Sequence, residues 1–441
     1  MSATRKRLCY LAAVIAPCLL TTFGPAQADE QFTATKIVQI PGKPLASFDI
    51  GYVDAAINTY VLADRSNAAV DVVNTRSNAF IRQLTGCGGN VALPTCSVFA
   101  GPITSPANSA GPNGVIIVDH KEVWAGDGVP PGSTSKVHVI NLRNNHLIAS
   151  VDTGGHFRAD ELCEDTRREL VLIANDDPAD SFLTFISSES HAIVGKIKLD
   201  GTDSNGKNIK ANGIEQCQNS ARNGKFYLAV PDVGGGTNGV NGSTGHDGAV
   251  LVISATKPFK VERVFPVAAS TGCLGPQGLQ FGPNHEIQLG CGGTNSVIID
   301  DRNGAIVAIE VNEGGADEVS YNPGNNHFFI ARSAAGALGV EDAGRLGTPD
   351  ADAPTAVGSH SVASDPVRNQ TYVPIRAAGS STVCASGNFG GNNANGCIAI
   401  YTAPSDKDDC LAEGEPVLAM NGNEPVFLHV KCRDHDHDHD D

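Results

Sequence analysis

Short runs of aliphatic and aromatic residues alternate with polar turns along most of the chain. Residues 59–64, 69–74 and 79–84 are three such runs, and each is rich in Val, Ile, Leu, Tyr or Phe. Segments such as Arg65-Ser66-Asn67 separate them. Runs of this length bounded by turn residues are typical of β-strands. The same plan predicts third strands at 137–141, 183–187, 250–254 and 297–300.

The pattern repeats seven times. Each unit opens with a short polar triplet and an aliphatic residue, as in Ala159-Asp160-Glu161-Leu162. The second residues of these openings stand at positions 48, 113, 160, 212, 277, 317 and 360, so the spacings are 65, 47, 52, 65, 40 and 43. Such periods are typical of four-stranded propeller blades. The prediction is an all-β, seven-bladed β-propeller of four-stranded blades around a central channel.

The repeats differ at the two ends of the chain. The sixth unit is irregular between positions 337 and 357, and the seventh shows only three strands after His360. We expect residues 35–40 to supply the missing strand, so that the mature N-terminal strand closes the ring. The predicted organisation is a signal peptide at 1–28, the propeller at 29–403, a disulfide-closed extension at 404–433 and a disordered His/Asp tail at 434–441.

The repeats resemble the YVTN-type β-propeller family. Tyr60-Val61-Leu62-Ala63-Asp64, Val70-Asp71-Val72-Val73-Asn74 and Val137-His138-Val139-Ile140-Asn141 match its second and third strands. The resemblance covers nearly the whole mature chain and implies the fold, together with a binding function that is frequent in the family. Fold alone does not determine function.

The N-terminus predicts export. Arg5, Lys6 and Arg7 precede an apolar stretch at 8–20, and Ala26-Gln27-Ala28 offers a cleavage site. No later stretch is apolar enough to span a membrane. The expected location is periplasmic or secreted, where cysteines form disulfides. Ten cysteines remain after cleavage, and their spacing suggests the pairs Cys87–Cys96, Cys163–Cys217, Cys273–Cys291, Cys384–Cys397 and Cys410–Cys432.

The charge excludes one class of partner. The chain has 31 Lys and Arg against 48 Asp and Glu, a net charge of −17. Such an acidic protein has no bulk attraction for nucleic acid or anionic lipid. We therefore expect a small-molecule substrate or ligand, no nucleic acid, no membrane span, and a monomer.

The polar openings predict a site at one end of the channel. The first strand of each blade lines the channel of a propeller, so the second residues of the openings should form a ring there. Long segments at 85–111, 126–135, 231–248, 333–337 and 377–396 all belong to this face, and one-sided loops over a rigid scaffold are typical of binding sites. The expected ring consists of Phe48, Asn113, Asp160, Asn212, Gln277, Asp317 and His360.

Several carboxylates around one channel repel one another unless protons, water or a cation intervene. The prediction is a divalent cation, Ca²⁺ first because the ligands are oxygens, with Zn²⁺ or Mn²⁺ as alternatives. The Asn-Gly and Asp-Glu openings resemble the metal-binding openings of the gluconolactonase/senescence-marker family, whose metal polarises a lactone. That family has six blades, however, whereas this chain has seven repeats. The predicted metal ligands are Asn113, Asp160, Glu161, Asn212, Asp317 and Glu318.

The first functional hypothesis is therefore a secreted enzyme that uses this cation on a small carbonyl or lactone substrate. His360, Asp49 and Glu215 are the expected catalytic acid/base groups. Phe48, Arg158, His156 and Gln277 are the expected substrate contacts. The alternative is a non-catalytic propeller that binds a protein, glycan or small ligand on its loop-rich face. A third hypothesis is a metal-buffering protein that uses the tail at 434–441.

Overall fold

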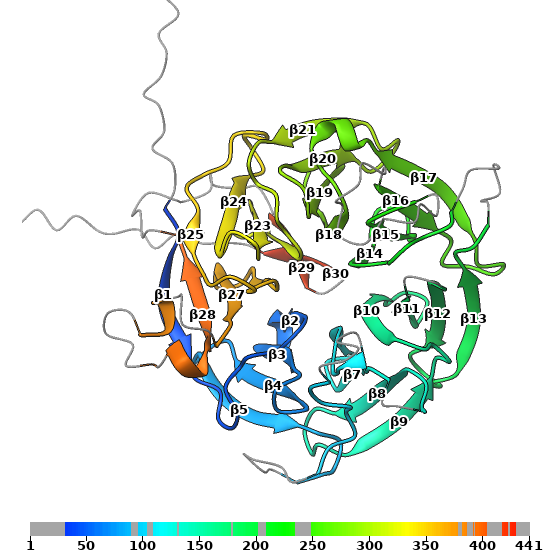
Figure 1. The fold of residues 1–441 in the computed structure, drawn as a ribbon, viewed down its shortest axis with the longest axis vertical. Helices are drawn as coiled ribbons and strands as arrows, with labels where there is room; N and C mark the ends of the chain where they lie inside the picture. Colours follow the sequence, from blue (N-terminus) through cyan, green and yellow to red (C-terminus); the bar gives the residue numbers. More distant parts are fainter. Residues whose placement is uncertain are drawn as a thin grey trace, which may run out of the picture.

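Four-stranded antiparallel sheets stand around a central axis like the blades of a fan (Figure 1). The computed structural model describes residues 31–89, 96–103, 109–129, 132–177, 180–201, 209–233, 248–377, 382–385, 391, 393–403, 417–421 and 424–428. Within these residues there are seven such sheets, which confirms the predicted seven-bladed propeller. In the first six sheets the strands follow chain order from the channel outwards.

The first three blades follow the sequence pattern closely. The three runs predicted at 59–64, 69–74 and 79–84 are strands with those bounds. Blade 1 consists of β2 (Gly51–Asp54), β3 (Thr59–Asp64), β4 (Ala69–Asn74) and β5 (Ala79–Leu84). Blade 2 consists of β6 (Val115–Val118), β7 (Glu122–Gly126), β8 (Lys136–Asn141) and β9 (Leu147–Asp152). Blade 3 consists of β10 (Arg158–Asp165), β11 (Leu170–Asp176), β12 (Phe182–Ser187) and β13 (Ile193–Lys198).

The next three blades include the irregular sixth unit. Blade 4 consists of β14 (Cys217–Asn219), β15 (Phe226–Val230), β16 (Gly248–Ile253) and β17 (Val261–Val267). Blade 5 consists of β18 (Pro276–Phe281), β19 (Glu286–Cys291), β20 (Ser296–Asp300) and β21 (Ile306–Glu310). Blade 6 consists of β22 (Val319–Asn322), β23 (His327–Arg332), β24 (Ala337–Asp342) and β25 (Ala353–Pro354). Short 3-10 turns lie at Ala55–Ile57, Ala269–Thr271, Val383–Ala385 and Asn393–Asn395.

Blade 7 combines the two ends of the propeller chain. Its inner strands are β26 (Ala363–Asp365), β27 (Gln370–Ile375) and β28 (Cys397–Thr402), and its outer strand is β1 (Thr33–Val38). β1 pairs antiparallel with β28, from Thr33 opposite Thr402 to Val38 opposite Ile398. The outer strand of the last blade is therefore the first strand of the described residues.

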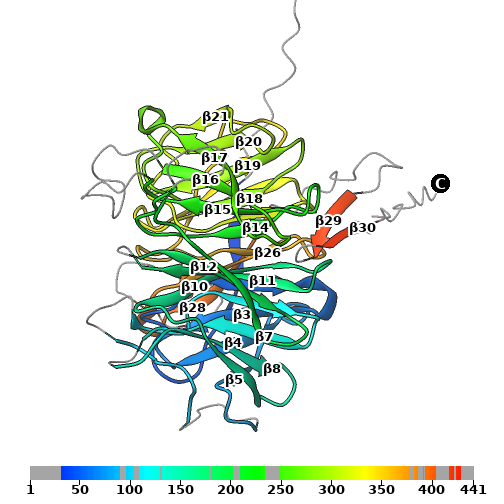
Figure 2. The same ribbon diagram turned by 90° about the vertical axis from the view of Figure 1, so that its right-hand side faces the viewer.

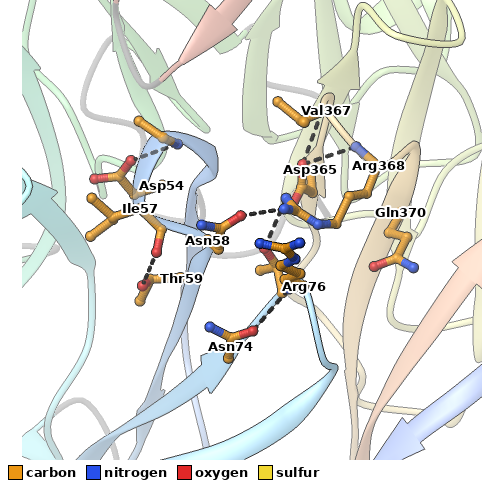
Figure 3. A network of polar contacts seen from close by, with 12 residues as sticks. Asp54, Ile57, Asn58, Thr59, Asn74, Arg76, Asp365, Val367, Arg368 and Gln370 are labelled. Atoms are coloured by element: carbon orange, nitrogen blue, oxygen red, sulfur yellow. Dashed lines mark hydrogen bonds and ion pairs between the residues drawn. The ribbon is translucent and has the colours of Figure 1, made fainter.

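A polar network joins blade 7 to blade 1 (Figure 3). Arg368, in the turn between β26 and β27, donates to Asp365 of its own blade at 2.9 Å. The same guanidinium donates to Asn58 Oδ1 and to Thr75 Oγ1 of blade 1. Asn58 adopts a left-handed backbone conformation with φ of 55° at the end of the short helical turn after β2. One arginine thus ties the last blade to the first.

Apolar side chains fill the spaces between neighbouring blades. One cluster contains Leu172, Phe185, Leu228 and Leu251, which come from blades 3 and 4 and are fully buried. Similar clusters lie between blades 1 and 2, 2 and 3, 4 and 5, 6 and 7, and 7 and 1. Burial between sheets explains why the middle strands read as continuous apolar runs.

Disulfide bonds connect eight of the cysteines in the described part of the chain. The pairs are Cys87–Cys96, Cys163–Cys217, Cys273–Cys291 and Cys384–Cys397, which confirms four predicted pairs. Such bonds indicate an oxidising environment, extracellular or periplasmic. No helix among the described residues is both long and apolar enough to cross a membrane. The fifth predicted pair, Cys410–Cys432, the signal peptide and the tail at 434–441 lie outside the described residues.

Two loop assignments need correction. Residues 333–336, expected among the long connections of the loop-rich face, form only a tight turn between β23 and β24. The irregular part of blade 6 lies at 343–352, between β24 and β25 and on the opposite face. After the propeller, β29 (Val417–Asn421) and β30 (Glu424–Leu428) pair as a separate hairpin, which lies off one face of the ring in Figure 2.

Three buried carboxyl groups predict a pH dependence of stability. Burial raises the pKa of Glu286, Glu313 and Glu341 from 4.5 to about 7. Because the folded state then binds more protons than the unfolded state, the free energy of unfolding should fall as pH rises from about 4.5 to about 7. Urea unfolding at pH 5 and pH 8 should give the higher midpoint at pH 5. The triple variant Glu286→Gln/Glu313→Gln/Glu341→Gln should show a smaller difference, although other buried carboxyl groups such as Glu310 contribute in the same direction. An unchanged difference would contradict the assignment.

Candidate binding site at the mouth of the channel

Backbone hydrogen bonds identify equivalent positions at the start of each blade. Asp49, Asn113, Glu215 and Asp317 each donate a backbone N–H to the second strand of their own blade at 2.8 to 3.0 Å. The next residue donates across to the neighbouring blade, as Gly114 does to the carbonyl of Asp160 at 3.1 Å. Corresponding bonds run from the backbone N–H of Gln216 to the carbonyl of Gln277 and from that of Glu318 to the carbonyl of His360. We call the resulting set the mouth ring: Asp49, Asn113, Asp160, Glu215, Gln277, Asp317 and His360.

Five of the seven residues of the expected ring occupy these equivalent positions. In blade 1 the register is wrong by one residue: Phe48 is buried and stacks on the His360 ring with centroids 4.8 Å apart. In blade 4 it is wrong by three residues, because Asn212 pairs its backbone with Asp232 at 3.1 Å before the strand begins. The irregular entry to β14 hides this shift from the repeat pattern.

Arg65 links blades 1 and 2 across the mouth ring. Its guanidinium forms an ion pair with Asp49 and donates to Asn113 Oδ1, at 3.0 Å from Nε. It also donates to the carbonyl of Phe48 at 3.3 Å. Burial alone would raise the pKa of Asp49, but the adjacent Arg65 and His360 hold it well below its usual value. Asp49 is therefore an ionised group locked into an ion pair.

His360 carries a positive charge in this arrangement. Its Nδ1 lies 2.9 Å from the carbonyl of Gly358 and its Nε2 lies 3.2 Å from Asp49 Oδ1. Both partners are acceptors, so both ring nitrogens must donate, which requires an imidazolium. Burial would lower the pKa of His360, but the hydrogen bond to Asp49 and the charge of Asp317 raise it. His360 is thus placed to donate a proton rather than to accept one.

Arg158 forms a second ion-pair cluster in blade 3. It contacts Asp160 at 2.8 Å and Asp176 at 3.1 Å, and all three side chains are largely buried. Arg158 is a predicted substrate contact, whereas in the structure its guanidinium pairs with Asp160 and Asp176 of its own blade. Sequence reasoning missed Arg65 and Asp176 as site residues. Arg65 directly follows β3 and Asp176 is the last residue of β11, so both lie where the second strand of a blade reaches the mouth. The ends of the predicted second strands would therefore have identified both residues.

Two carboxylates of the mouth ring remain uncompensated. Glu215 and Asp317 are partly exposed, and among the described residues neither side chain has a hydrogen bond or an ion pair. Burial raises the pKa of both, and the negative charge of Asp176 adds to this for Glu215. With all carboxylates ionised, Asp49, Asp160, Asp176, Glu215 and Asp317 carry five negative charges against three on Arg65, Arg158 and His360.

A second layer lies beneath the mouth ring. Glu161 and Glu318 are buried and interact with each other, and two carboxyl groups can form a hydrogen bond only when at least one of them holds a proton. Burial and mutual repulsion raise the pKa of Glu161. Gln216 Nε2 donates to Glu318 at 2.7 Å. Blades 2 and 5 contribute Gly114 and Gly278 at this level, where a Cβ would come within 2.2 Å of a neighbouring carbonyl oxygen.

Two of the six predicted metal ligands, Asn113 and Asp160, do not fit a divalent cation as they are arranged. Asn113 Oδ1 accepts a hydrogen bond from Arg65, and Asp160 forms an ion pair with Arg158, so both side chains face guanidinium groups that would repel a metal ion. Within the described ranges, no three His, Cys, Asp or Glu side chains are grouped as metal ligands. The two arginines supply part of the positive charge that the sequence analysis assigned to a metal.

The two remaining predicted substrate contacts, Gln277 and His156, lie in different surroundings. Gln277 lies half-buried in the mouth ring, whereas His156 is exposed two residues before β10. The long connections between β5 and β6 and between β15 and β16 do lie on the face of the mouth ring, although residues 90–95, 104–108 and 234–247 within them are outside the described part.

Comparisons with known proteins bear on the fold. No protein-family model matches the chain, and no curated protein matches it by sequence. Among solved structures, the chain is similar to the WD40 repeats of RRP9, with a TM-score of 0.59, 10% identity and coverage of 85% of this chain and 100% of that one. A chain of the mitotic checkpoint complex gives a TM-score of 0.56 at 12% identity, covering 90% and 98%. A chain of Kuenenia stuttgartiensis hydrazine synthase gives 0.56 at 12%, covering 76% and 94%. At such identities these likenesses establish the seven-bladed fold alone.

Proposed function

We propose that this protein is an exported, monomeric, non-catalytic propeller that binds a small ligand bearing a primary ammonium group at the mouth ring. The observation that carries the proposal is the pair of uncompensated carboxylates, Glu215 and Asp317, in a ring whose other charges are already matched. An ammonium group can donate hydrogen bonds to both carboxylates. The resemblance of the repeats to the YVTN-type family, whose members frequently bind ligands, supports the same reading.

The surrounding geometry supports a rigid, selective site. Arg65 and Arg158 hold Asp49, Asn113 and Asp160 in fixed positions, so the ring needs little reorganisation when a ligand enters. Their positive charges disfavour a ligand that carries only cationic groups packed closely together. The ligand is expected to contact blades 4 and 6 with its ammonium group and to turn uncharged polar groups towards Gln277 between them.

Calorimetric titration with ethanolamine, which carries one primary ammonium group and one hydroxyl group, tests the proposal. We expect saturable binding at low salt, and the Glu215→Gln/Asp317→Asn variant should bind at least 10-fold more weakly because a charge-assisted hydrogen bond contributes about 1.5 to 3 kcal/mol. Glu189→Gln, which removes an exposed carboxylate on blade 3, is the matched control and should bind normally. Equal affinity in the mouth variant and the control would rule out the mouth ring as the ammonium site.

The second candidate is the metal-dependent hydrolase. The observation that favours it is the His360 imidazolium at the mouth, which is a suitable general acid beside Asp49. Elemental analysis of protein without the 434–441 tail provides the test. About one divalent ion per chain, lost in an Asp160→Ala/Asp317→Ala variant, would favour the enzyme and justify a lactone screen. Absence of metal from both proteins would remove this candidate.

A further inference from the structure

The channel holds a cavity below the Glu161–Glu318 layer, of about 140 Å³. Glu161, Gln216 and Glu318 line one end of it, and none of the mouth-ring side chains lines it. The first strands run away from the mouth, so Phe281 and Tyr321, near the ends of β18 and β22, line its far end. We call this cavity the lower chamber. It is separate from the site proposed above.

The ionisable side chains with acid or base character that line the lower chamber are acidic rather than basic. Glu161, Glu164 and Glu318 contribute carboxyl groups, whereas no Lys, Arg or His side chain lines the cavity. At the mouth, by contrast, arginines match most of the carboxylates. A cavity lined by carboxyl groups and by no cationic side chain favours a positively charged ligand.

Aromatic rings are a second feature of the lower chamber that favours a cation. Tyr52, Phe281 and Tyr321 line the chamber, and they come from blades 1, 5 and 6. Phe281 is held edge-on by Tyr227 at 5.0 Å, and the hydroxyl of Tyr321 donates to Asn326 at 2.8 Å. The rings are therefore fixed, with one tyrosine hydroxyl directed to a partner outside the chamber. Fixed aromatic faces attract cations, and they favour quaternary ammonium groups, which cannot use hydrogen bonds.

An unpartnered buried donor gives independent evidence for a ligand. Asn219 lines the chamber and is 5% exposed, yet its Nδ2 has no hydrogen-bond partner among the described residues. Gln280, also in the lining, has an unpartnered Oε1. Buried polar atoms without partners are costly, so a cavity that contains them is built to receive polar atoms.

We infer that the lower chamber binds a small quaternary ammonium compound that also carries a hydrogen-bonding group. The trimethylated nitrogen lies between the aromatic rings of Phe281 and Tyr321, near the carboxyl groups. The hydrogen-bonding group, such as a hydroxyl, pairs with Asn219 and Gln280. This assignment does not depend on the proposed function of the mouth ring, because the two sites share no side chain and favour different ammonium groups.

Titration of the full-length protein with choline tests the inference. We expect saturable binding, with tetramethylammonium weaker than choline because it lacks the hydroxyl. Tyr321→Leu should weaken choline binding at least 10-fold, whereas Tyr321→Phe, which keeps the ring, should stay within 3-fold of the natural protein. Asn219→Leu should weaken choline but leave tetramethylammonium unchanged. Equal choline binding by Tyr321→Leu and Tyr321→Phe would overturn the inference.

Two further controls keep the test decisive. If Tyr321→Leu does not fold, which loss of the native Trp124 fluorescence would report, Phe281→Leu takes its place with the same expected loss. The Glu215→Gln/Asp317→Asn variant should bind choline as the natural protein does, so failure of the mouth proposal leaves this result intact. Ammonium chloride that competes as well as choline would show that the aromatic rings play no part and would overturn the inference.

Discussion

Replacing both Cys163 and Cys217 by alanine is expected to lower the free energy of unfolding by about 4 kcal/mol. The bond joins β10 to β14, the inner strands of blades 3 and 4, across a sequence separation of 54 residues. A crosslink over so long a segment strongly restricts the unfolded chain. Both cysteines are also buried in the apolar cluster between these blades. Urea unfolding followed by the fluorescence of the single Trp124 measures the effect.

The Cys87–Cys96 bond provides the matched control. It spans a separation of only 9 residues, so the corresponding double alanine variant should lose less, about 2.7 kcal/mol. The order of the two losses is the sharper prediction, because it does not depend on the absolute scale. A larger loss for Cys87 and Cys96 would show that loop length is not the main factor.

Arg158→Met is expected to lower the free energy of unfolding by about 3 kcal/mol at pH 8. The substitution keeps the apolar part of the side chain but leaves Asp160 and Asp176 buried without their shared partner. Two carboxylates in one buried site then repel each other unless they bind protons. The loss should therefore be smaller at pH 5 than at pH 8, and urea unfolding at both pH values measures it.

Arg302→Met serves as the control for the removal of an arginine. Arg302 pairs with Asp300 on the surface, where its side chain is 61% exposed. Ion pairs of this kind contribute little to stability, so the unfolding midpoint should hardly change. An Arg158→Met protein as stable as the Arg302→Met protein would show that Asp160 and Asp176 do not depend on Arg158.

Sequence reasoning predicts the fold well because each blade carries its own local signals. The bounds of β3, β4 and β5 follow from β-rich runs between turn residues, and the aliphatic pattern is repeated in every unit. Blade 6 is the exception. Its outer strand contains only Ala353 and Pro354, which is too short to leave a pattern, so the sequence does not distinguish the tight turn at 333–336 from part of a long loop.

The site is harder to predict because its partners are distant in sequence. Arg65 reaches Asn113 across 48 positions, and Gln216 reaches Glu318 across 102. Repeat alignment identified the correct start of most blades and therefore most of the acidic groups. It could not identify which charges are matched by arginines, since the repeat pattern does not show that Arg65 pairs with Asp49 or that Arg158 pairs with both Asp160 and Asp176. The sequence indicates that the carboxylates of the ring need positive charge nearby. Which side chains supply that charge depends on the tertiary structure.

The pairing of β1 with β28 has a consequence for assembly. Until Thr33–Val38 docks, β28 leaves an unpaired edge on a sheet that is otherwise complete. The hydroxyl of Thr35 and the carbonyl of Ile400, which meet in the finished ring, lie 365 positions apart in the chain. During folding, the N-terminal strand of a second molecule can occupy the same edge. At high protein concentration, refolding should therefore yield dimers that have exchanged their first strands.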